Sequence, residues 1–444
     1  MKKLIILAAG KGTRMKSDLP KVMHTLGNQP MLEHVIENAK RDEQTEVILV
    51  VGYGAEEVKQ YFGERVKYAV QEQQLGTGHA VMCAMDFVHD DDEVIITCGD
   101  TPLISAEDFE GLINKKSEGY GAVLMSSVVA NPKDYGRIIK KDDFFEKIVE
   151  ERDASPEQRQ IKEVNVGTYI IDGALLKRSI SQITTENDQG EYYLTDVFGF
   201  AAKESKVATY PIAEENMLGI NSKLQLAQAE TLLRKKINEK HMQNGVTIVH
   251  PEVTYIDSRV QIAEGCVIYP NCHLRGETVI GKNSVIKEDS TLENAKIGEN
   301  TTIWSSTIVD ATVGDFVTVG PYAYLRPKTV VGNHCKIGDF VELKNAQFGE
   351  GSKASHLAYI GDAIVGKNVN IGCGVVFVNY DGKNKFTTTI GDNAFVGSNV
   401  NLVAPVEIGE NATLAAGSTI TDNVPDSALA LARERQINKE NWKK

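Results

Sequence analysis

The chain has 444 residues and a mass of 48.7 kDa, which at about 100–200 residues per domain allows two to four domains. Hydrophobic residues make up 42% and charged residues 25%, so the composition excludes wholesale disorder, a collagen-like chain and a membrane-embedded protein. The net charge of −13 argues against a general nucleic-acid or anionic-membrane binder, because such proteins present a basic face.

The start of the chain predicts a first strand rather than a signal peptide, because its short apolar run ends at Gly10 and Lys11. No later stretch of about 18 uncharged apolar residues predicts a membrane span. The six cysteines form no Cys-x-x-Cys pair, which indicates reduced thiols. We therefore expect a cytoplasmic protein without membrane or nucleic-acid partners.

Residues 1–221 alternate short β-branched runs with segments of helical period. Strands are predicted at 4–7, 46–51 and 94–97, and a helix over 31–41. This alternation is typical of a mainly parallel sheet covered by helices, so we expect an α/β Rossmann-like domain. Ligands of such sheets bind at the carboxyl ends of the strands.

Residues 222–245 predict one linker helix, because Ser222 to Gln225 spell a capping box and Gly245 offers a C-terminal stop. The second domain is predicted over residues 246–444, where aliphatic residues recur every six positions from Ile262 to Ile420, often followed by glycine, before a C-terminal tail. This period predicts a three-sided parallel β-helix, expected in the left-handed form. We expect loops at two five-residue phase slips, 292–297 and 343–348, and at the interruption over 379–389.

The loop after the first strand predicts a phosphate site. Small residues over 7–12 allow the backbone to approach a phosphate, and Arg14 and Lys21 can balance the charge of a triphosphate. The loop is not a P-loop, because it lacks Gly-Lys-Ser/Thr at the proper spacing. It is not a dinucleotide fingerprint either, because Met15 stands where the third glycine would be. P-loop kinases and dehydrogenases are therefore excluded.

Further motifs resemble those of the sugar-1-phosphate nucleotidyltransferases. They include the segments 71–80, 99–103, 135–138, 148–150, 163–167 and 219–221. Because a hexapeptide β-helix follows them, the whole chain resembles the bacterial bifunctional N-acetylglucosamine-1-phosphate uridyltransferase/glucosamine-1-phosphate N-acetyltransferase family. Hexapeptide-repeat proteins prefer to assemble as trimers, so the resemblance also implies a homotrimer.

For the first half, the resemblance implies attack of a sugar phosphate on the α-phosphorus of UTP, with Arg14 and Lys21 as catalytic cations. It implies Asp100 and Asn221 as Mg²⁺ ligands. The residues implied to bind UTP and UDP-N-acetylglucosamine are Leu7, Ala8, Ala9, Gly10, Lys21, Gln71, Gly76, Thr77, Gly136, Glu150, Asn165 and Asn221.

For the second half, the resemblance implies N-acetylation of glucosamine-1-phosphate by acetyl-coenzyme A, giving N-acetylglucosamine-1-phosphate, with His356 as the general base. The residues implied to bind glucosamine-1-phosphate are Arg326, Lys344, Tyr359 and Asn370. The residues implied to bind acetyl-coenzyme A are Cys373, Asn379, Tyr380, Lys385, Ser398, Ala416 and Arg433, with Lys385 also suited to the sugar phosphate. We expect the His356 imidazole and these cations not to be scattered over opposite faces of the coil.

Two alternatives remain open at this point. The protein could be a single-activity sugar-1-phosphate nucleotidyltransferase whose β-helix only forms a trimer, or a catalytically inactive scaffold. The segment 372–379 is also more apolar than the usual family form, which places one contact with the coenzyme in question. Cys373 has no histidine at a motif spacing that would favour a nucleophilic role.

Overall fold

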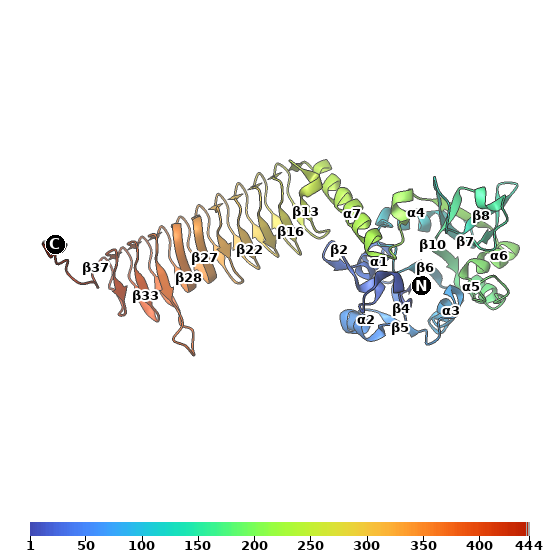
Figure 1. The fold of residues 1–444 in the computed structure, drawn as a ribbon, viewed down its shortest axis with the longest axis horizontal. Coiled ribbons are helices and arrows are strands. Elements are labelled where there is room, and N and C mark those ends of the chain that lie inside the picture. The colour runs from blue at the N-terminus through green and yellow to red at the C-terminus, as the bar shows by residue number, and fades with distance from the viewer. Residues whose placement is uncertain (441, 443–444) are drawn as a thin grey trace. The chain divides into compact units, whose positions relative to one another are not determined.

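The fold is described from a computed structural model that covers residues 1–440 and 442. The chain divides into two compact units, Met1–Leu232 and Leu233–Lys444. Figure 1 labels the elements of both units. Each unit is described below by itself.

The first unit contains a nine-stranded sheet whose main path runs β11-β7-β10-β6-β1-β4-β5. Neighbouring strands pair in parallel, except that β10 is antiparallel to both β6 and β7. A hairpin of β8 and β9 extends the sheet from β10. The bounds are β1 (Lys2–Leu7), β4 (Glu46–Val51), β5 (Lys67–Val70), β6 (Glu93–Cys98), β7 (Ala122–Val128), β8 (Arg137–Lys141), β9 (Phe144–Val149), β10 (Glu163–Asp172) and β11 (Val207–Pro211).

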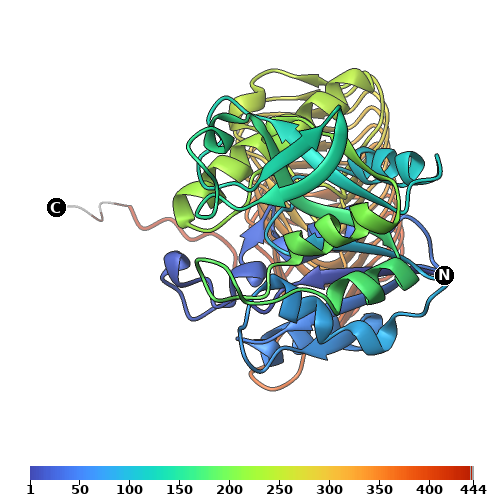
Figure 2. The same ribbon diagram turned by 90° about the vertical axis from the view of Figure 1, so that its right-hand side faces the viewer.

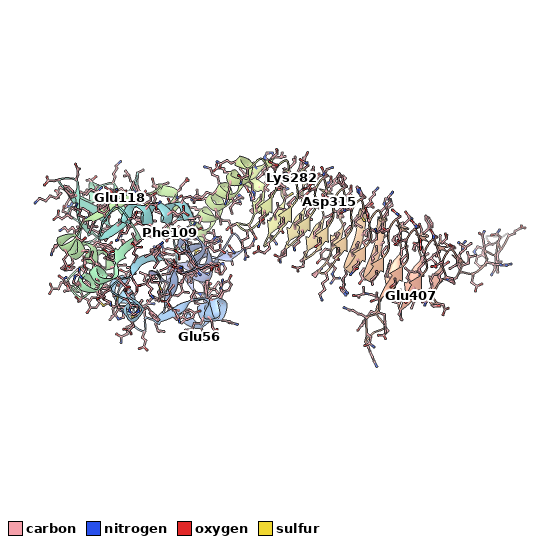
Figure 3. The ribbon with its side chains drawn as sticks, turned by 180° about the vertical axis from the view of Figure 1, so that it is seen from behind. Glu56, Phe109, Glu118, Lys282, Asp315 and Glu407 are labelled. Carbon is pink, nitrogen blue, oxygen red and sulfur yellow. The ribbon has the colours of Figure 1, made fainter. Side chains whose placement is uncertain are left out.

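Helices cover both faces of this sheet, because its central strands are apolar on both sides. Along β1, Leu4 and Ile6 belong to one core cluster, whereas Ile5 belongs to the other. The first cluster is covered by α1 (Met31–Ala39), α2 (Ala55–Phe62) and α4 (Ala106–Lys116), and the second by α3 (Thr77–Met82), α5 (Gly173–Ile180) and α6 (Leu194–Glu204). Phe109 of α4, labelled in Figure 3, is fully buried in the first cluster.

Shorter elements complete the first unit and lead into the second. They are a hairpin of β2 (Thr25–Leu26) and β3 (Gln29–Pro30), and the 3₁₀ turns η1 (Thr13–Met15), η2 (Lys21–Met23), η3 (Gly63–Arg65), η4 (Met85–Phe87), η5 (Gln158–Gln160), η6 (Glu214–Met217) and η7 (Pro251–Val253). Helix α7 (Lys223–Gln243) contributes residues to both units. The Ser222 hydroxyl accepts the Gln225 backbone N–H at its start, at 3.2 Å.

In its described residues, the second unit is a parallel coil of 26 strands with three faces. Each strand pairs with the strand that lies one coil further along the chain. The first face holds β12 (Thr247–Ile248), β15 (Val267–Ile268), β18 (Val285–Ile286), β21 (Thr302–Ile303), β24 (Thr318–Val319), β29 (Asn370–Ile371), β32 (Phe395–Val396), β35 (Thr413–Leu414) and β37 (Leu429–Ala430).

The second face holds β13 (Tyr255–Ile256), β16 (His273–Arg275), β19 (Thr291–Glu293), β22 (Thr307–Val309), β25 (Tyr324–Leu325), β30 (Val376–Val378), β33 (Asn401–Val403) and β36 (Thr419–Ile420). The third face holds β14 (Gln261–Ile262), β17 (Val279–Ile280), β20 (Lys296–Ile297), β23 (Thr312–Val313), β26 (Val330–Val331), β31 (Thr388–Ile390) and β34 (Val406–Ile408). The long strands β27 (Lys336–Phe348) and β28 (Lys353–Val365) run across all three faces.

The interior of the coil is one continuous aliphatic core, formed by the residues of the six-residue repeat. Small polar residues at the corners are buried but paired: the Ser284 hydroxyl donates to the Gly298 carbonyl at 2.8 Å. Cys266 and Cys335 take the same type of position, and burial raises the pKa of both thiols. All six cysteines are free. Lys282, Asp315 and Glu407 point outward from the coil (Figure 3).

The glycines that follow the repeat residues allow consecutive coils to approach each other. A Cβ atom at Gly332 would lie 2.7 Å from the Glu350 backbone nitrogen, and one at Gly372 would lie 2.6 Å from the Ser398 nitrogen. Both distances are too short for a side chain, so the glycine is required by the backbone of the next coil.

The two five-residue phase slips do not produce loops, so that expectation is wrong. Val279 pairs with Lys296 after 17 residues, whereas His273 pairs with Thr291 after 18, and the ladders continue through both slips. A corner that is one residue shorter absorbs the difference. The interruption over 379–389 does leave the coil as a projecting loop (Figure 2), which is closed by an isolated bridge between Tyr380 and Lys385.

Candidate functional site

One pocket of the first unit opens where β1, β5 and β6 end. Because these strands are parallel, their carboxyl ends lie at the same edge of the sheet, as the sequence predicted. The pocket is lined by Leu7, Ala8, Ala9, Gly10, Lys21, Val22, Gln71, Gln74, Gly76, Thr77, Ala80, Cys98, Asp100 and Glu191. It thus brings together most of the residues predicted to bind a nucleotide.

The glycine loop is held close to the lysine that follows it. Gly12 has a φ of 60°, and a Cβ atom there would lie 2.6 Å from the Cβ of Lys21. The Gln74 side chain donates to the Ala9 carbonyl at 2.7 Å and so connects this loop to the segment after β5.

Lys21 connects the two predicted metal ligands. Its ammonium donates to Asp100 Oδ2 at 2.5 Å and to Asn221 Oδ1 at 3.0 Å, although the three residues are far apart in sequence. Asn221 is itself positioned by the start of α7, since its backbone N–H donates to the Gln225 side chain at 2.9 Å. One carboxylate oxygen and one amide oxygen therefore face a single cation.

Three implied nucleotide ligands, Gln71, Gly76 and Thr77, line the pocket, and Gln71 also holds the loop itself. The Gln71 amide donates to the Gly76 carbonyl at 3.0 Å and lies 3.2 Å from His79 Nδ1. Thr77 accepts a hydrogen bond from the Leu194 backbone N–H at 3.1 Å. Gly76 has a φ of 109° and lies against the Tyr192 carbonyl. Gln71 thus holds the loop whose backbone faces the pocket.

A second pocket adjoins the first, and the two share Cys98 and Asp100. It is lined by Arg14, Cys98, Asp100, Thr101, Lys133, Asp134, Tyr135, Glu150, Glu151, Arg152, Val166, Gln189, Tyr193, Met217, Gly219, Asn221 and Gln225. The Asn165 backbone N–H donates to the Gly136 carbonyl at 2.8 Å. Of the implied ligands Gly136, Glu150 and Asn165, Glu150 lines this pocket, whereas Gly136 and Asn165 are not among its lining residues. Gly136 lies beside Glu150, since a Cβ atom there would lie 3.4 Å from Glu150 Oε2.

Burial raises the pKa of two groups in this second pocket. Burial raises the pKa of Glu150, although the Thr195 hydroxyl, which donates to Glu150 at 2.9 Å, opposes the rise. Burial also raises the pKa of Tyr193 to about 12, so its hydroxyl stays protonated at neutral pH. The pocket consequently offers both acceptors and a donor for the hydroxyl groups of a sugar.

Arg137 holds two walls of this pocket and was not predicted as a site residue. It is 1% exposed and donates to the Tyr135 carbonyl, to Glu151 Oε2 at 2.5 Å and to the Arg159 carbonyl at 3.2 Å. Tyr135 and Glu151 both line the pocket. The motif at 135–138 contained this arginine, but the sequence alone could not show that its side chain turns inward.

Replacing Arg137 by lysine is expected to raise the KM for the sugar phosphate about tenfold, because an ammonium cannot hold three separate acceptors. The free energy of unfolding of the first unit should fall by about 2 kcal/mol. Steady-state kinetics and denaturant unfolding measure both effects. Arg178→Lys, at an exposed arginine that pairs with Glu204, is the matched control. A KM for the sugar phosphate equal to that of the control would contradict the positioning role.

In the second unit, the edge between the first and second faces carries a row of predicted residues. Asp339 pairs with His356 in the register of β27 and β28, and Cys373, Ser398 and Ala416 occupy the same corner on the following coils. Each of these five residues directly precedes a residue with positive φ. The predicted base and three predicted coenzyme contacts therefore form one line along the coil.

The edge between the second and third faces carries the predicted cations. Arg326 donates to Glu342 at 2.8 Å, and Lys344 lies 3.8 Å from Asp362. Burial acts to raise the pKa of Asp362, but hydrogen bonds from Asn345 and Asn379 hold it below its usual value. Asp362 is thus a negatively charged group close to Lys344.

Lys385 reaches the same edge from the projecting loop. The pKa of Lys385 is lowered because the Lys344 ammonium lies against it. Two neighbouring cations that repel each other form a ready site for an anion such as a phosphate. In the loop, the Asn379 side chain lies 3.5 Å from the Tyr359 hydroxyl and the Tyr380 hydroxyl donates to the Gly382 carbonyl.

The predicted imidazole and cations lie at the two edges of one face, and not on opposite faces. Six residues separate His356 from Asp362 along β28, which is about 20 Å of extended chain. No hydrogen bond or ion pair within residues 1–440 joins His356 to Arg326, Lys344 or Lys385. Asn370 belongs to the first face, where it pairs with Lys353, and Arg433 lies in the irregular segment beyond β37.

The lowered pKa of Lys385 predicts how binding of the amino-sugar phosphate depends on pH. Lys385 loses its proton at a lower pH than an ordinary lysine, so the KM for the phosphate substrate should rise early on the alkaline side. In Lys344→Met, the KM should be roughly tenfold higher at neutral pH, and the alkaline rise should move to higher pH. Lys383→Met, in the same loop, should leave the profile unchanged. An alkaline rise at the same pH in Lys344→Met and in the native enzyme would exclude this arrangement.

Comparisons with known proteins agree with this geometry. Residues 4–141 match the MobA-like NTP transferase domain, and residues 259–294, 310–345 and 387–422 match the bacterial transferase hexapeptide of six repeats. The bifunctional protein GlmU of Clostridioides difficile is 51% identical over 99% of this chain and 97% of its own length. Those of Alkaliphilus oremlandii and Alkaliphilus metalliredigens are 51% and 48% identical, over 100% and 99% of this chain and 98% and 97% of their own lengths.

The fold and the two sites define a transferase that joins a nucleotidyltransferase domain to a left-handed parallel β-helix of hexapeptide repeats. The resemblance predicted from the motifs is confirmed. The chain belongs to the family of the bifunctional protein GlmU. It is an enzyme with a nucleotidyltransferase and an acetyl-coenzyme A-dependent acetyltransferase activity, so the inactive-scaffold alternative is excluded. No helix within the described part of the chain is long and apolar enough to cross a membrane.

Proposed function

We propose that the coil acetylates glucosamine-1-phosphate and that the first unit then transfers a uridyl group from UTP to the product, N-acetylglucosamine-1-phosphate. The observation that carries this proposal is the pair of adjoining pockets that share Cys98 and Asp100, where Asp100 accepts a hydrogen bond from Lys21 of the first pocket. One is shaped by backbone and glutamine residues suited to a nucleotide, and the other by polar groups suited to a sugar.

Uridyl transfer needs positioning and charge neutralisation rather than a covalent nucleophile. Residues 7–10 and Lys21 line the pocket proposed for the triphosphate, while Arg14 lines the adjoining pocket proposed for the sugar. The sugar phosphate oxygen attacks the α-phosphorus, and the bond to pyrophosphate breaks in line. Lys21 from the first pocket and Arg14 from the second balance the charge of the reacting phosphates.

Mg²⁺ fits the oxygen pair of Asp100 and Asn221, which already faces the Lys21 ammonium. A carboxylate and an amide oxygen, completed by phosphate oxygens, are a usual ligand set for this ion. Within the described residues, no cluster of three or more His, Cys, Asp or Glu offers a stronger protein-only metal site. Bound there, Mg²⁺ would neutralise charge on the triphosphate.

Acetyl transfer uses His356 as the general base. Its imidazole takes a proton from the sugar ammonium, and the free amine attacks the thioester carbonyl. The new C–N bond forms as the C–S bond breaks, and the coenzyme A thiolate takes up a proton. Lys344 and Lys385 hold the sugar phosphate, while Cys373, Ser398 and Ala416 border the line along which the coenzyme lies.

A homotrimer would bring the two edges of the second face together. The His356 edge of one copy would meet the lysine edge of the next, because one chain holds these groups too far apart to close on one amino sugar. Tyr322, Phe340 and Leu357 support this assembly, since these large apolar residues are 57–62% exposed on the His356 edge. The rings of Tyr322 and Phe340 stack at 5.6 Å into a continuous apolar ridge.

The two activities should be separable by single substitutions. Asp100→Ala should lower uridyl transfer about a hundredfold or more and leave acetyl transfer unchanged, because it removes the charge that holds Lys21 and the metal. His356→Ala should lower acetyl transfer about a hundredfold or more and spare uridyl transfer. A chelator should stop only uridyl transfer. Separate assays of pyrophosphate release and coenzyme A release measure these effects, and equal loss of both activities in either variant would refute the assignment.

Mixing two impaired variants, assayed at a sugar-phosphate concentration well below the native KM, tests the shared acetyl-transfer site. Trimers formed by co-expression of His356→Ala and Lys344→Ala chains should regain about a quarter of the native acetyl-transfer rate, because that share of sites combines two intact edges. Mixing Lys344→Ala with Arg326→Ala should regain much less. These two residues lie on the same edge, so every site in the mixture lacks either Lys344 or Arg326. If each site belonged to one chain, the first mixture would show no more than the mean rate of the two variants assayed alone.

A further inference from the structure

We propose that Asp339 is a positioning residue for acetyl transfer, which fixes the tautomer of His356 and offsets the positive charge that the imidazole gains when it accepts a proton. This inference rests on the proposed role of His356 as the general base. It adds a second residue to the reaction centre, one that the sequence motifs did not single out.

The coil itself brings the two residues together. Asp339 of β27 and His356 of β28 are 17 residues apart and are register partners on consecutive coils, which lie about 4.8 Å apart. Both stand at the corner between the first and second faces. Asp339 Oδ1 lies 2.7 Å from His356 Nδ1, which is a short, charge-assisted hydrogen-bond distance.

The direction of this hydrogen bond determines which ring nitrogen is free. The pKa of Asp339 is held below its usual value, chiefly because the His356 side chain hydrogen-bonds to it. An ionised carboxylate can only accept hydrogen bonds, so Nδ1 must carry the hydrogen. Nε2 is then left with the lone pair that a general base requires.

The described residues next to His356 on the neighbouring coils at this edge include no carboxylate other than Asp339. Lys336 lies near Asp339 and helps to keep it ionised, and the next coil places the uncharged Cys373 beside His356. Asp339 is therefore the carboxylate that can stabilise an imidazolium at this position. Asp and His coupled in this way recur in enzymes in which a histidine moves protons.

A purely structural role does not explain this pair. The side chains of His356 and Asp339 are 60% and 39% exposed in the single chain, and exposed ion pairs contribute little to folding. Their local backbone is held by the ladder between β27 and β28, which does not depend on either side chain. The carboxylate stabilises His356 most when the imidazole carries the transferred proton and is positively charged.

The test compares Asp339→Asn and Asp339→Glu with the native enzyme. Asp339→Asn keeps a side chain of the same shape but loses the charge and can present its amide N–H to Nδ1, which favours the unproductive tautomer. We expect kcat for acetyl transfer to fall roughly a hundredfold, with KM for both substrates changed less than about threefold, because the lost interaction is made in the transition state. Asp339→Glu should recover at least tenfold of that loss.

Two controls separate this role from damage to the fold. Uridyl transfer by the same preparations should be unchanged. Glu288→Gln alters an acidic residue at the same corner three coils earlier, whose carboxylate accepts from Trp304 Nε1 at 3.1 Å, and it should leave acetyl transfer unchanged.

The outcomes distinguish this inference from the proposed function. If His356→Ala abolishes acetyl transfer but Asp339→Asn keeps the native kcat, the positioning role is wrong and the base assignment stands. If His356→Ala itself retains acetyl transfer, the proposed base is wrong and the role of Asp339 is rejected with it. If Asp339→Asn and Asp339→Glu lose kcat equally, or if the loss lies in KM or in trimer formation, the role of Asp339 is structural and the inference is overturned.

Discussion

Parallel main-chain pairing is the constraint on which both sites depend. In the first unit it aligns the carboxyl ends of β1, β4, β5 and β6, so that loops from distant parts of the chain converge on Lys21 and Asp100. In the second unit it stacks each coil on the previous one, so that residues 17 or 18 positions apart become neighbours. A catalytic group therefore needs no long loop to meet its partner, because the ladder of hydrogen bonds places it.

Much of this arrangement follows from sequence patterns that reflect packing. The six-residue period identified the coil because every sixth side chain fills its interior, and the alternating runs identified the layered sheet. The convergence of the glycine loop, Lys21 and Asp100 at one edge of the sheet was predictable, because small residues and charges follow buried strands. Each of these signals lies within a short stretch of the chain, because it reflects how neighbouring residues are buried or exposed.

The remaining features depend on side-chain directions and on contacts between distant residues. Arg137 turns into the protein to bind two carbonyls and Glu151, which no pattern around residue 137 encodes. The pairing of Asp339 with His356 requires the exact register of two coils. The phase slips at 292–297 and 343–348 misled the prediction, because a corner can lose one residue without breaking the ladders. Gln71 holds Gly76 in place, a role that its position in a base-binding motif did not reveal.

The corners of variable length have a consequence for how this fold can change over generations. In an α-helix, inserting one amino acid rotates everything downstream by about 100° and ruins the buried stripe. Here, pairs separated by 17, 18 or 25 residues stay in phase, so a codon gained or lost at a bend leaves the rest of the prism intact. Such an architecture can acquire an appendage like the one bearing Lys385 in a single genetic event, and can try out a new ligand contact without first being rebuilt.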